Sequence, residues 1–600
     1  MSGHQRASVP LDDRRKPASA GQRRIKRLLP VLGWLRGYRR AWLLPDLLAG
    51  LALWAVMVPE GMAYAGIVGV PPIMGLYTIV PPLIAYALLG TSRVLVVGPD
   101  TATGLISALT IGAIAVQGTA SFNALTSMLA ILIGAFFLLF GMLRLGWVAA
   151  FIPTPVMRGF IEGLICVTII GQVPHLLGIE GTSGSFFAKL WFALRHLTEA
   201  LPASALTGLL SLVAMLSMRR FAPRLPAALV VAVAATVLVG LFDGEAAGVS
   251  VVGGLPSGLP RLTLPDFDPA KLRELAPGAL AIVLVGYAEA LGGAKAAALQ
   301  GGGEIDPNQE LVAHGPANIL SGLFGGFLVV GSLSKTSVAV AAGARTQLTN
   351  VVAAVFCFFT LVWLTPLFRG MPHPALAAIV IAAMLHLSQP RYLRDLLARS
   401  RWEFAIVAIV IAAELTLGVL QGIVLGVALS LLLLVYRTSH PQGAVLGQLP
   451  GTEAYRDVHR HREALIFPGL LIWRAGGDLF FASMGHFEEG LKAALSASRP
   501  PVKHVLVDAD SVNFIDTSAC DSLLNSIKEL QRQGITFAFA RVRDEVRERM
   551  RLGGIEAEMG SSNFYERVTD GVRAWGQQQS LDAASAHAGA WRGFTPWKSQ

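Results

Sequence analysis

The chain has 600 residues, of which 53% are hydrophobic and 15% charged, and its mean hydropathy is +0.57. This composition is too apolar for an ordinary soluble protein and predicts a chain that crosses a membrane many times. The net charge of +10 could suggest a nucleic-acid binder, but the arginines gather in the breaks between apolar runs, where they set membrane orientation instead.

Residues 1–45 contain many arginines and lysines, and the basic part up to Arg27 has few apolar residues. This pattern predicts a basic cytoplasmic segment, disordered in its most basic part, that touches anionic lipid. A cleaved signal peptide is not expected, because the first apolar run begins too late and no small-residue cleavage site follows a short apolar stretch.

Residues 46–438 alternate apolar runs with short polar breaks and predict about fourteen membrane spans. Basic residues cluster in the breaks that alternating spans place inside, for example Arg219 with Arg220 and Arg399 with Arg401. We therefore expect both termini in the cytoplasm and the protein in the inner (cytoplasmic) membrane.

The predicted spans form two sets of seven, residues 46–242 and 276–437, and the third span of each set is interrupted. Breaker and capping residues stand at 98–104 (GPDTATG) and at 331–337 (GSLSKTS). An odd number of spans per set inverts one set relative to the other, which is typical of an inverted repeat. A helix that starts in mid-membrane has unpaired N–H groups and a partial positive charge, so two such starts predict an anion site at the repeat interface.

From residue 460 to 576, charged amphipathic helices alternate with short β-branched runs, which predicts a cytoplasmic α/β domain. The expected strands are 470–473, 479–482, 505–508 and 536–541, and the expected helices are 487–496, 518–533 and 545–552. Residues 577–600 are rich in Ala, Ser and Gly and are expected to be disordered.

Several long motifs occur in the order in which a known family has them. They are PEGMAYA at 59–65, PPIMGLY at 71–77, GTSR at 90–93, VGP at 97–99, EAL at 289–291, IDPNQEL at 305–311 and GSLSKT at 331–336, with Gly315 and Asn318. On these motifs the chain strongly resembles the sulfate permease (SulP) family, the bacterial relatives of solute carrier family 26. Residues 514–518 (FIDTS) look like the signature of a STAS domain, the usual C-terminal partner of these transporters.

The resemblance implies a core domain and a gate domain that move in an elevator-like cycle, and a homodimer. It also implies an anion held between the starts of spans three and ten and flanked by spans one and eight. The substrate-facing residues would then be Glu60, Tyr64, Pro99, Asp100, Thr101, Leu333, Ser334 and Lys335, with Glu289 as the acidic residue of span eight. Ser518 matches the position that is phosphorylated in anti-sigma factor antagonists, although in transporters the domain more often serves dimerisation or a cytosolic regulator.

The charged residues near the interruptions each have a second interpretation. Glu289 follows the apolar run 282–288, where an ionised carboxylate is costly, so it either couples an ion or pairs structurally with Lys335. Lys335 either adds positive charge to the site or extends to the cytoplasmic surface. Ser334 would cap its helix and donate to substrate, and Asp100 is a preferred N-cap residue.

The charges of the predicted site do not balance for an anion. Two helix starts supply roughly half a positive charge each and Lys335 adds one, against the negative charges of Glu60, Asp100 and Glu289. We therefore expect a carboxylate to hold a proton when the anion is bound, with Glu289 as the main carrier and Glu60 as the secondary one. This favours proton-coupled symport, but a sodium ion could neutralise the same carboxylates, and that alternative stays open.

The sequence thus favours a secondary active anion transporter with sulfate as the leading substrate. Bicarbonate with sodium, or a C4-dicarboxylate with protons, are the alternative substrates, and the competing functions are an uncoupled anion channel or motor and an interaction protein that acts through its STAS domain. The three cysteines lie far apart, and no hydrolytic constellation or phosphate-binding loop is found, so we expect no enzyme, cofactor or metal site.

Overall fold

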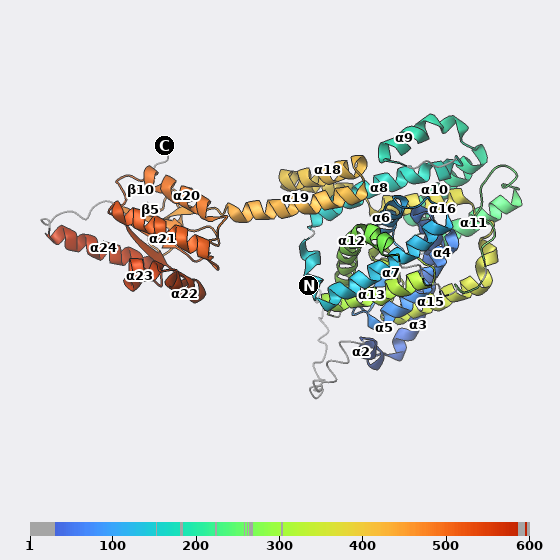
Figure 1. The fold of residues 1–600 in the computed structure, drawn as a ribbon, viewed down its shortest axis with the longest axis horizontal. Helices are drawn as coiled ribbons and strands as arrows, with labels where there is room; N and C mark the ends of the chain where they lie inside the picture. Colours follow the sequence, from blue (N-terminus) through green and yellow to red (C-terminus); the bar gives the residue numbers. More distant parts are fainter. Residues whose placement is uncertain are drawn as a thin grey trace, which may run out of the picture. The chain divides into compact units, whose positions relative to one another are not determined.

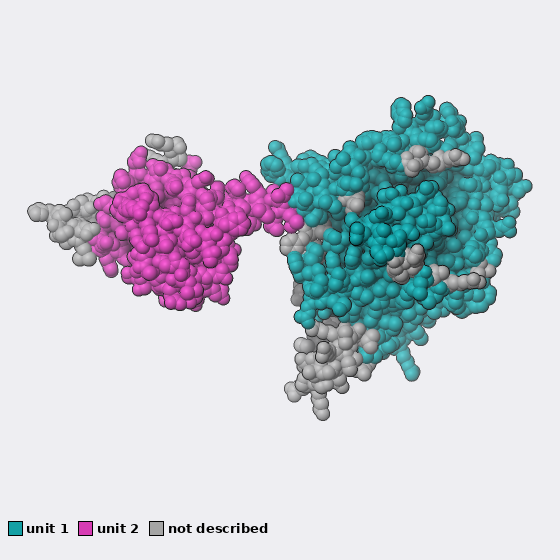
Figure 2. All heavy atoms as spheres, viewed as in Figure 1, with its two compact units in different colours: residues 1–430 teal, residues 431–600 magenta. Residues whose placement is uncertain are grey.

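The computed structural model describes residues 30–151, 153–179, 184–222, 225–256, 258–260, 262, 264, 268–301, 304–585 and 595–596. The most basic part of the N-terminal segment, for which disorder is expected, lies outside these residues. The chain forms two compact units, Met1–Ser430 (unit 1) and Leu431–Gln600 (unit 2), which Figure 2 distinguishes by colour. The division falls inside one long helix, α19 (Val419–Ser439), slightly before the predicted boundary at 438.

Among the described residues, unit 1 is built mainly of helices (Figure 1), together with two short strands. Its α-helices are α2 (Val31–Arg36), α3 (Leu43–Val68), α4 (Pro72–Tyr77), α5 (Val80–Leu89), α6 (Thr101–Gly112), α7 (Ala120–Met142), α8 (Thr154–Leu177), α9 (Phe186–Arg195), α10 (Pro202–Phe221), α11 (Ala227–Leu241), α12 (Pro269–Gly301), α13 (Pro307–Leu323), α14 (Leu333–Ala341), α15 (Leu348–Phe359), α16 (His373–Leu387), α17 (Pro390–Arg399), α18 (Arg401–Thr416) and the start of α19.

Many of these helices are long and apolar enough to cross a membrane. By length and composition, nine helical segments qualify within the described residues, and the apolar helices α6 and α11 are shorter. A polytopic helical membrane protein is therefore confirmed, whereas the number of about fourteen spans stays a prediction.

The helices of unit 1 pack into two bodies. The core body consists of α3–α7 and α12–α15, in which α13 packs on α5 and α7, and α3 packs on α14 and α15. The gate body consists of α8, α10, α11, α16 and α18, in which α16 packs on α8 and α10. Helix α3 also contacts α11 and α16, so it lies at the boundary between the two bodies. This division agrees with the core and gate domains that the resemblance implied.

Glycines allow close backbone contacts inside the core body. Gly75 of α4 faces Gly61 of α3 so closely that a Cβ on Gly75 would overlap the Gly61 carbonyl oxygen. Gly134 of α7 and Gly315 of α13 face each other in the same way, since a Cβ on Gly134 would lie 2.6 Å from the Gly315 carbonyl oxygen. Small residues are what let membrane helices approach this closely.

Two short strands from the two halves of unit 1 pair in the middle of the core body. Strand β1 (Val96–Gly98) runs antiparallel to β2 (Val330–Ser332), with Val97 opposite Gly331. Helix α6 follows β1 and α14 follows β2, so the two interrupted segments meet with opposite direction. This is the arrangement expected of an inverted repeat.

Unit 2 is an α/β domain. Its strands are β3 (Ala444–Gln448), β4 (Tyr455–Asp457), β5 (Leu465–Ile466), β6 (Leu470–Arg474), β7 (His504–Asp508), β8 (Thr536–Ala540), β9 (Phe564–Tyr565) and β10 (Thr595–Pro596), and its helices are the end of α19, α20 (Met484–Ala497), α21 (Thr517–Arg532), α22 (Asp544–Leu552), α23 (Ile555–Met559) and α24 (Val568–Ser585). Strands β6, β7, β8 and β9 pair in parallel, and β3 adds to β6 antiparallel.

Two sequence predictions for unit 2 are wrong, and one strand was not expected. Residues 479–482 are not a strand, because the Ser483 hydroxyl accepts from the Phe480 N–H and donates to the Asp478 carbonyl, which closes a turn before α20. Strand β3, which was not expected from the sequence, lies before the predicted start of the domain and pairs with β6. Residues 577–585 are helical and not disordered, because their Gln, Leu and Ala residues favour helix and continue α24.

Candidate functional site

The two helix starts that the sequence singled out lie side by side, but they differ in how they are capped. Asp100 is the N-cap of α6, and its carboxylate accepts hydrogen bonds from the backbone N–H groups of Ala102 and Thr103. The Thr103 hydroxyl also lies 3.3 Å from the same carboxylate oxygen. The N-cap interpretation of Asp100 is therefore confirmed, and much of the positive end of α6 is already neutralised.

Helix α14 has no such cap. It begins at Leu333 after Ser332, whose side chain makes no capping hydrogen bond. The prediction that Ser334 caps this helix is wrong, because Ser334 lies inside the first turn and its hydroxyl is 3.1 Å from that of Ser332. Among the described residues, no capping side chain accepts from the first N–H groups of α14, which leaves this end attractive for an anion.

Lys335 lies in the first turn of α14 and is only 1% exposed. Its Nζ donates a hydrogen bond of 2.8 Å to the carbonyl oxygen of Pro99 and lies 3.4 Å from Oε2 of Glu60. The ammonium also stands over the ring of Tyr64, 4.8 Å from the centroid. Lys335 thus links α14, the start of α6 and α3, and it does not extend to the surface.

Glu60 and Tyr64 project from α3, one helical turn apart. Tyr64 donates a long hydrogen bond of 3.5 Å to Glu60, and its hydroxyl interacts with the Thr101 side chain. Both residues are buried, as are Pro99 and Thr101. The close Gly61–Gly75 contact presses this part of α3 against α4 and so fixes where Glu60 lies.

Glu289 lies on α12 and is partly buried. The charges of Asp100 and Lys335 both act on it, so it belongs to the same electrostatic environment. The ion pair of Lys335 is made with Glu60, however, and not with Glu289. The structural pairing of Glu289 with Lys335 is therefore absent from the described residues.

The remaining predicted residues are Leu333, Ser334 and Ser518, and they are more exposed than the buried residues around Lys335. Leu333 is 47% exposed, and Ser334 is half-buried at the start of α14. Ser518 lies in unit 2, exposed in the first turn of α21, where Asp516 is the N-cap. Ser518 therefore belongs to a different unit from Lys335.

Sequence reasoning missed two basic groups of the gate body. Arg219, at the end of α10, donates a hydrogen bond of 2.7 Å to the Ala382 carbonyl of α16. His386, at the end of α16, lies within electrostatic reach of Arg219 and Glu60. The only signal in the sequence was their position at the ends of apolar runs, which is where orientation-setting charges also lie.

The charges of the described residues around the site can be added up. Lys335 and Glu60 neutralise each other, and Asp100 is neutralised in part by the α6 dipole. Glu289 adds a further nearby carboxylate, while the start of α14 remains partly positive. No group of three or more His, Cys, Asp or Glu residues suitable for a metal ion occurs in the part of the chain that the structure describes. The arrangement can thus hold an anion at α14 if Lys335 is released from Glu60.

Known proteins resemble the chain in sequence and in fold. A family model described as "Sulfate permease family" matches residues 43–410, and one described as "STAS domain" matches residues 461–571. A protein from Mycobacterium tuberculosis (strain CDC 1551 / Oshkosh), named a probable sulfate transporter, is 34% identical over 548 residues, covering 91% of this chain and 98% of that protein. Probable sulfate transporter 4.2 from Arabidopsis thaliana is 30% identical over 576 residues, covering 92% of this chain and 84% of that protein.

A solved structure gives the same result at the level of fold. The structure of member A9 of solute carrier family 26 matches with a TM-score of 0.87 and 22% sequence identity, covering 97% of this chain and 98% of that chain. The match spans both units, so the two chains share the helical membrane fold and the C-terminal α/β domain.

Proposed function

Because the chain belongs to the sulfate permease family, we propose that it is a secondary active transporter that moves sulfate together with protons. Family membership makes it a membrane anion transporter with a STAS domain, in a family of transporters and not of enzymes. The choice of sulfate is supported by the names of the bacterial and plant relatives, and the choice of protons by the charges of the site.

The observation that carries the proposal is the burial of Lys335 at the uncapped start of α14. The anion would lie against the first N–H groups of this helix, with the Lys335 ammonium and the Ser334 hydroxyl as further donors. Tyr64 and Thr101 would border it from α3 and α6. Leu333, the first residue of α14, is exposed and would line the approach to the site.

Competition for Lys335 supports proton coupling. In the structure the ammonium is 3.4 Å from the Glu60 carboxylate, so an incoming anion has to replace that carboxylate. A proton on Glu60 removes the competing charge, and anion and proton binding then favour each other. The sequence assigned the main coupling role to Glu289, but this contact favours Glu60, with Glu289 as a second carboxylate in the same field.

Movement of the two helix bodies would provide alternating access. The site lies on α3, α6 and α14 of the core body, and α3 is also the helix that contacts α11 and α16 of the gate body. An elevator-like displacement at that contact would carry the site from one side of the membrane to the other. We further propose that the protein lies in the inner membrane as a homodimer, which the family resemblance implies, with both termini in the cytoplasm, which the distribution of arginines suggests.

Uptake by the purified protein in proteoliposomes tests the proposal. Radiolabelled sulfate, bicarbonate and a C4-dicarboxylate are offered under an imposed proton gradient and, separately, under a sodium gradient. We expect sulfate uptake driven by protons. Bicarbonate uptake driven by sodium, or C4-dicarboxylate uptake without sulfate uptake, would replace the proposed substrate, and anion flux that no gradient drives would indicate a channel.

Two variants test whether the anion binds at Lys335. Lys335→Ala should lower the apparent affinity for sulfate about tenfold or more, because a charge-assisted hydrogen bond is lost. The single variant leaves Glu60 buried and unpaired, which could unfold the protein. The double variant Lys335→Ala/Glu60→Gln removes that problem, and normal sulfate affinity in it would contradict the assignment.

A further inference from the structure

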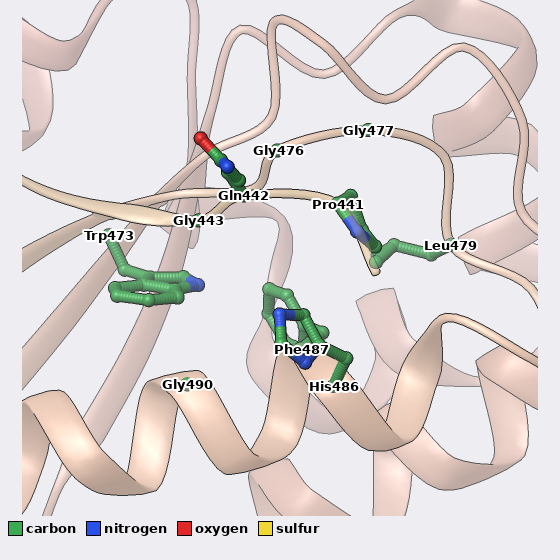
Figure 3. A pocket seen from close by; sticks show the side chains of 10 residues that line it. All are labelled: Pro441, Gln442, Gly443, Trp473, Gly476, Gly477, Leu479, His486, Phe487 and Gly490. Carbon is green, nitrogen blue, oxygen red and sulfur yellow. The ribbon is translucent and has the colours of Figure 1, made fainter. Parts of the chain in front are cut away.

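Unit 2 contains a cavity of about 270 Å³ next to the segment that follows α19 (Figure 3). It is bordered by Pro441–Gly443 at the start of the domain, by Trp473 of β6, by the loop at Gly476, Gly477 and Leu479, and by His486, Phe487 and Gly490 of α20. All of these residues belong to unit 2. Neither the transport mechanism nor the sheet requires an open space at this place.

Glycines shape the slot in which Trp473 lies. A Cβ on Gly443 would overlap the indole ring, and one on Gly490 would lie 2.9 Å from it. A Cβ on Gly476 would overlap the Gln442 carbonyl oxygen, so the loop and the start of the domain also pass close together. The indole ring is therefore held between the backbone at Gly443 and the backbone at Gly490, which fixes its orientation.

The indole N–H of Trp473 has no hydrogen-bond partner, although the residue is only 7% exposed. Figure 3 shows this nitrogen on the side of the ring that faces His486 across the cavity. Buried polar groups nearly always find a partner, and an indole nitrogen can only donate. The unpartnered donor therefore indicates that an acceptor enters the cavity.

The lining residues restrict what that acceptor can be. No Lys, Arg, Asp or Glu lines the cavity, which is unsuitable for a phosphate group or a divalent cation. Its volume is also small for a nucleotide. Pro441, Leu479 and Phe487 give the cavity an apolar wall. Trp473 and His486 carry N–H groups that can donate hydrogen bonds to the two oxygens of one ligand group.

We propose that this cavity binds a small monocarboxylate with an apolar, preferably planar, body. The carboxylate accepts from the Trp473 indole and from the His486 imidazole, and the body lies against Phe487, Leu479 and Pro441. Such a ligand holds the start of the domain against β6 and α20. His486 in turn lies 5.1 Å from the ring of His440, which stacks on Tyr436 of α19, so binding is felt at the end of that helix.

Benzoate serves as the probe, with the full-length protein in detergent. Isothermal titration should give one benzoate site, and saturating sulfate should leave it unchanged, because the cavity is separate from the Lys335 site. Trp473→Phe keeps an aromatic ring and removes the donor, so it should weaken benzoate binding about tenfold or more. The matched control is Trp575→Phe, which changes another buried tryptophan of the same unit outside the cavity and should leave binding unchanged.

Hydrogen–deuterium exchange locates the site independently of any variant. Benzoate should slow exchange in peptides that contain Pro441–Gly443 and in those from Trp473 to Gly490. Benzyl alcohol, which has the same body without the carboxylate, should bind more weakly. The proposal is overturned if benzoate does not bind, if sulfate displaces it, if Trp473→Phe binds it normally, or if the protected peptides lie elsewhere; a water molecule would then be the partner of the indole.

Discussion

At the scale of residues, the Lys335–Glu60 pair is the feature that most needs a functional reason. Taking two charges out of water costs more than a buried ion pair usually returns, so such a pair is a weak source of stability. It is useful if one partner is exchanged during the reaction. An anion that displaces Glu60 finds Lys335, a hydrophobic surrounding and the open start of α14 already in place.

Glu60→Gln should remove most of the pH dependence of transport. In the unchanged protein, sulfate uptake should rise as the outside pH is lowered over the range tested, because anion and proton binding favour each other at this site. The amide cannot take up a proton and competes less for the ammonium, so uptake by the variant should be nearly the same across this range. Initial rates at several pH values, with an imposed gradient held constant, measure this.

Glu289→Gln is the comparison for that experiment. If Glu289 is the secondary carboxylate, its variant should keep a reduced but recognisable pH response. A flat response in Glu289→Gln together with a normal one in Glu60→Gln would return the main coupling role to Glu289 and contradict the geometry of the ion pair.

His504 gives unit 2 a stability that depends on pH. Burial lowers the pKa of this imidazole from 6.5 to about 4, and its ring stacks on Trp575 with Nε2 unpartnered. The unfolded chain therefore binds the proton more readily, so stability is complete above pH 6.5 and is lost as the pH falls toward 4. Between pH 7 and 5 the expected loss is about 2 kcal/mol.

Urea unfolding of unit 2 in the full-length protein, followed by pulse proteolysis at pH 7, 6 and 5, measures this loss. His504→Gln should flatten the profile, because its side chain does not titrate. His461→Gln, at a histidine exposed on the same unit, is the control and should behave like the unchanged protein. An equally steep profile in His504→Gln would show that another group is responsible.

At the scale of elements, the close approach of α3 and α4 positions the site. Gly75→Ala places a methyl group on the Gly61 backbone, which cannot move away as a side-chain tip could. We expect a loss of stability of about 1–3 kcal/mol and a lower sulfate affinity, because α3 carries Glu60 and Tyr64. Gly66→Ala on α3 meets nothing within 4 Å and is the control. Thermal unfolding in detergent compares the two, and equal melting temperatures would refute the packing argument.

The placement of the elements explains which features of the site the sequence could predict and which it could not. The two interrupted segments were predictable, because Gly, Pro and capping residues at matching places in two apolar runs indicate helices that start inside the membrane. The partner of Lys335 was not, since Glu60 and Glu289 are equally plausible until α3 and α12 are placed. The capping of α14 was predicted wrongly, because a serine near a helix start looks like a cap whether it stands at Ser332 or at Ser334.

In unit 2 the buried parallel strands were predictable from their β-branched runs, but the edges were not. Residues 479–482 contain two phenylalanines, yet Phe481 is exposed and the segment is a turn. Strand β3 is short and contains a glycine, so its pattern is visible only beside β6. The local sequence pattern predicts a strand less well where pairing with a distant strand decides the structure.

At the scale of the whole molecule, the division into two units predicts that unit 1 can be studied alone. Truncation after Arg437 should leave a membrane protein that elutes as a single species in detergent and binds sulfate with nearly the same affinity, because every residue of the proposed site lies in unit 1. Its transport rate should fall, because the STAS domain is lost. A truncated protein that is well folded but binds no sulfate would contradict the assignment of the site to unit 1.

The central claim is that sulfate and protons move together through the site at Lys335 and Glu60, and proton movement driven by sulfate tests it most directly. Proteoliposomes that contain a pH-sensitive dye, without sodium and without an imposed pH gradient, receive sulfate outside. We predict that the lumen acidifies with the unchanged protein and that the double variant Lys335→Ala/Glu60→Gln shows no such change. Sulfate entry without acidification, or entry that occurs only when sodium is added, would contradict the account.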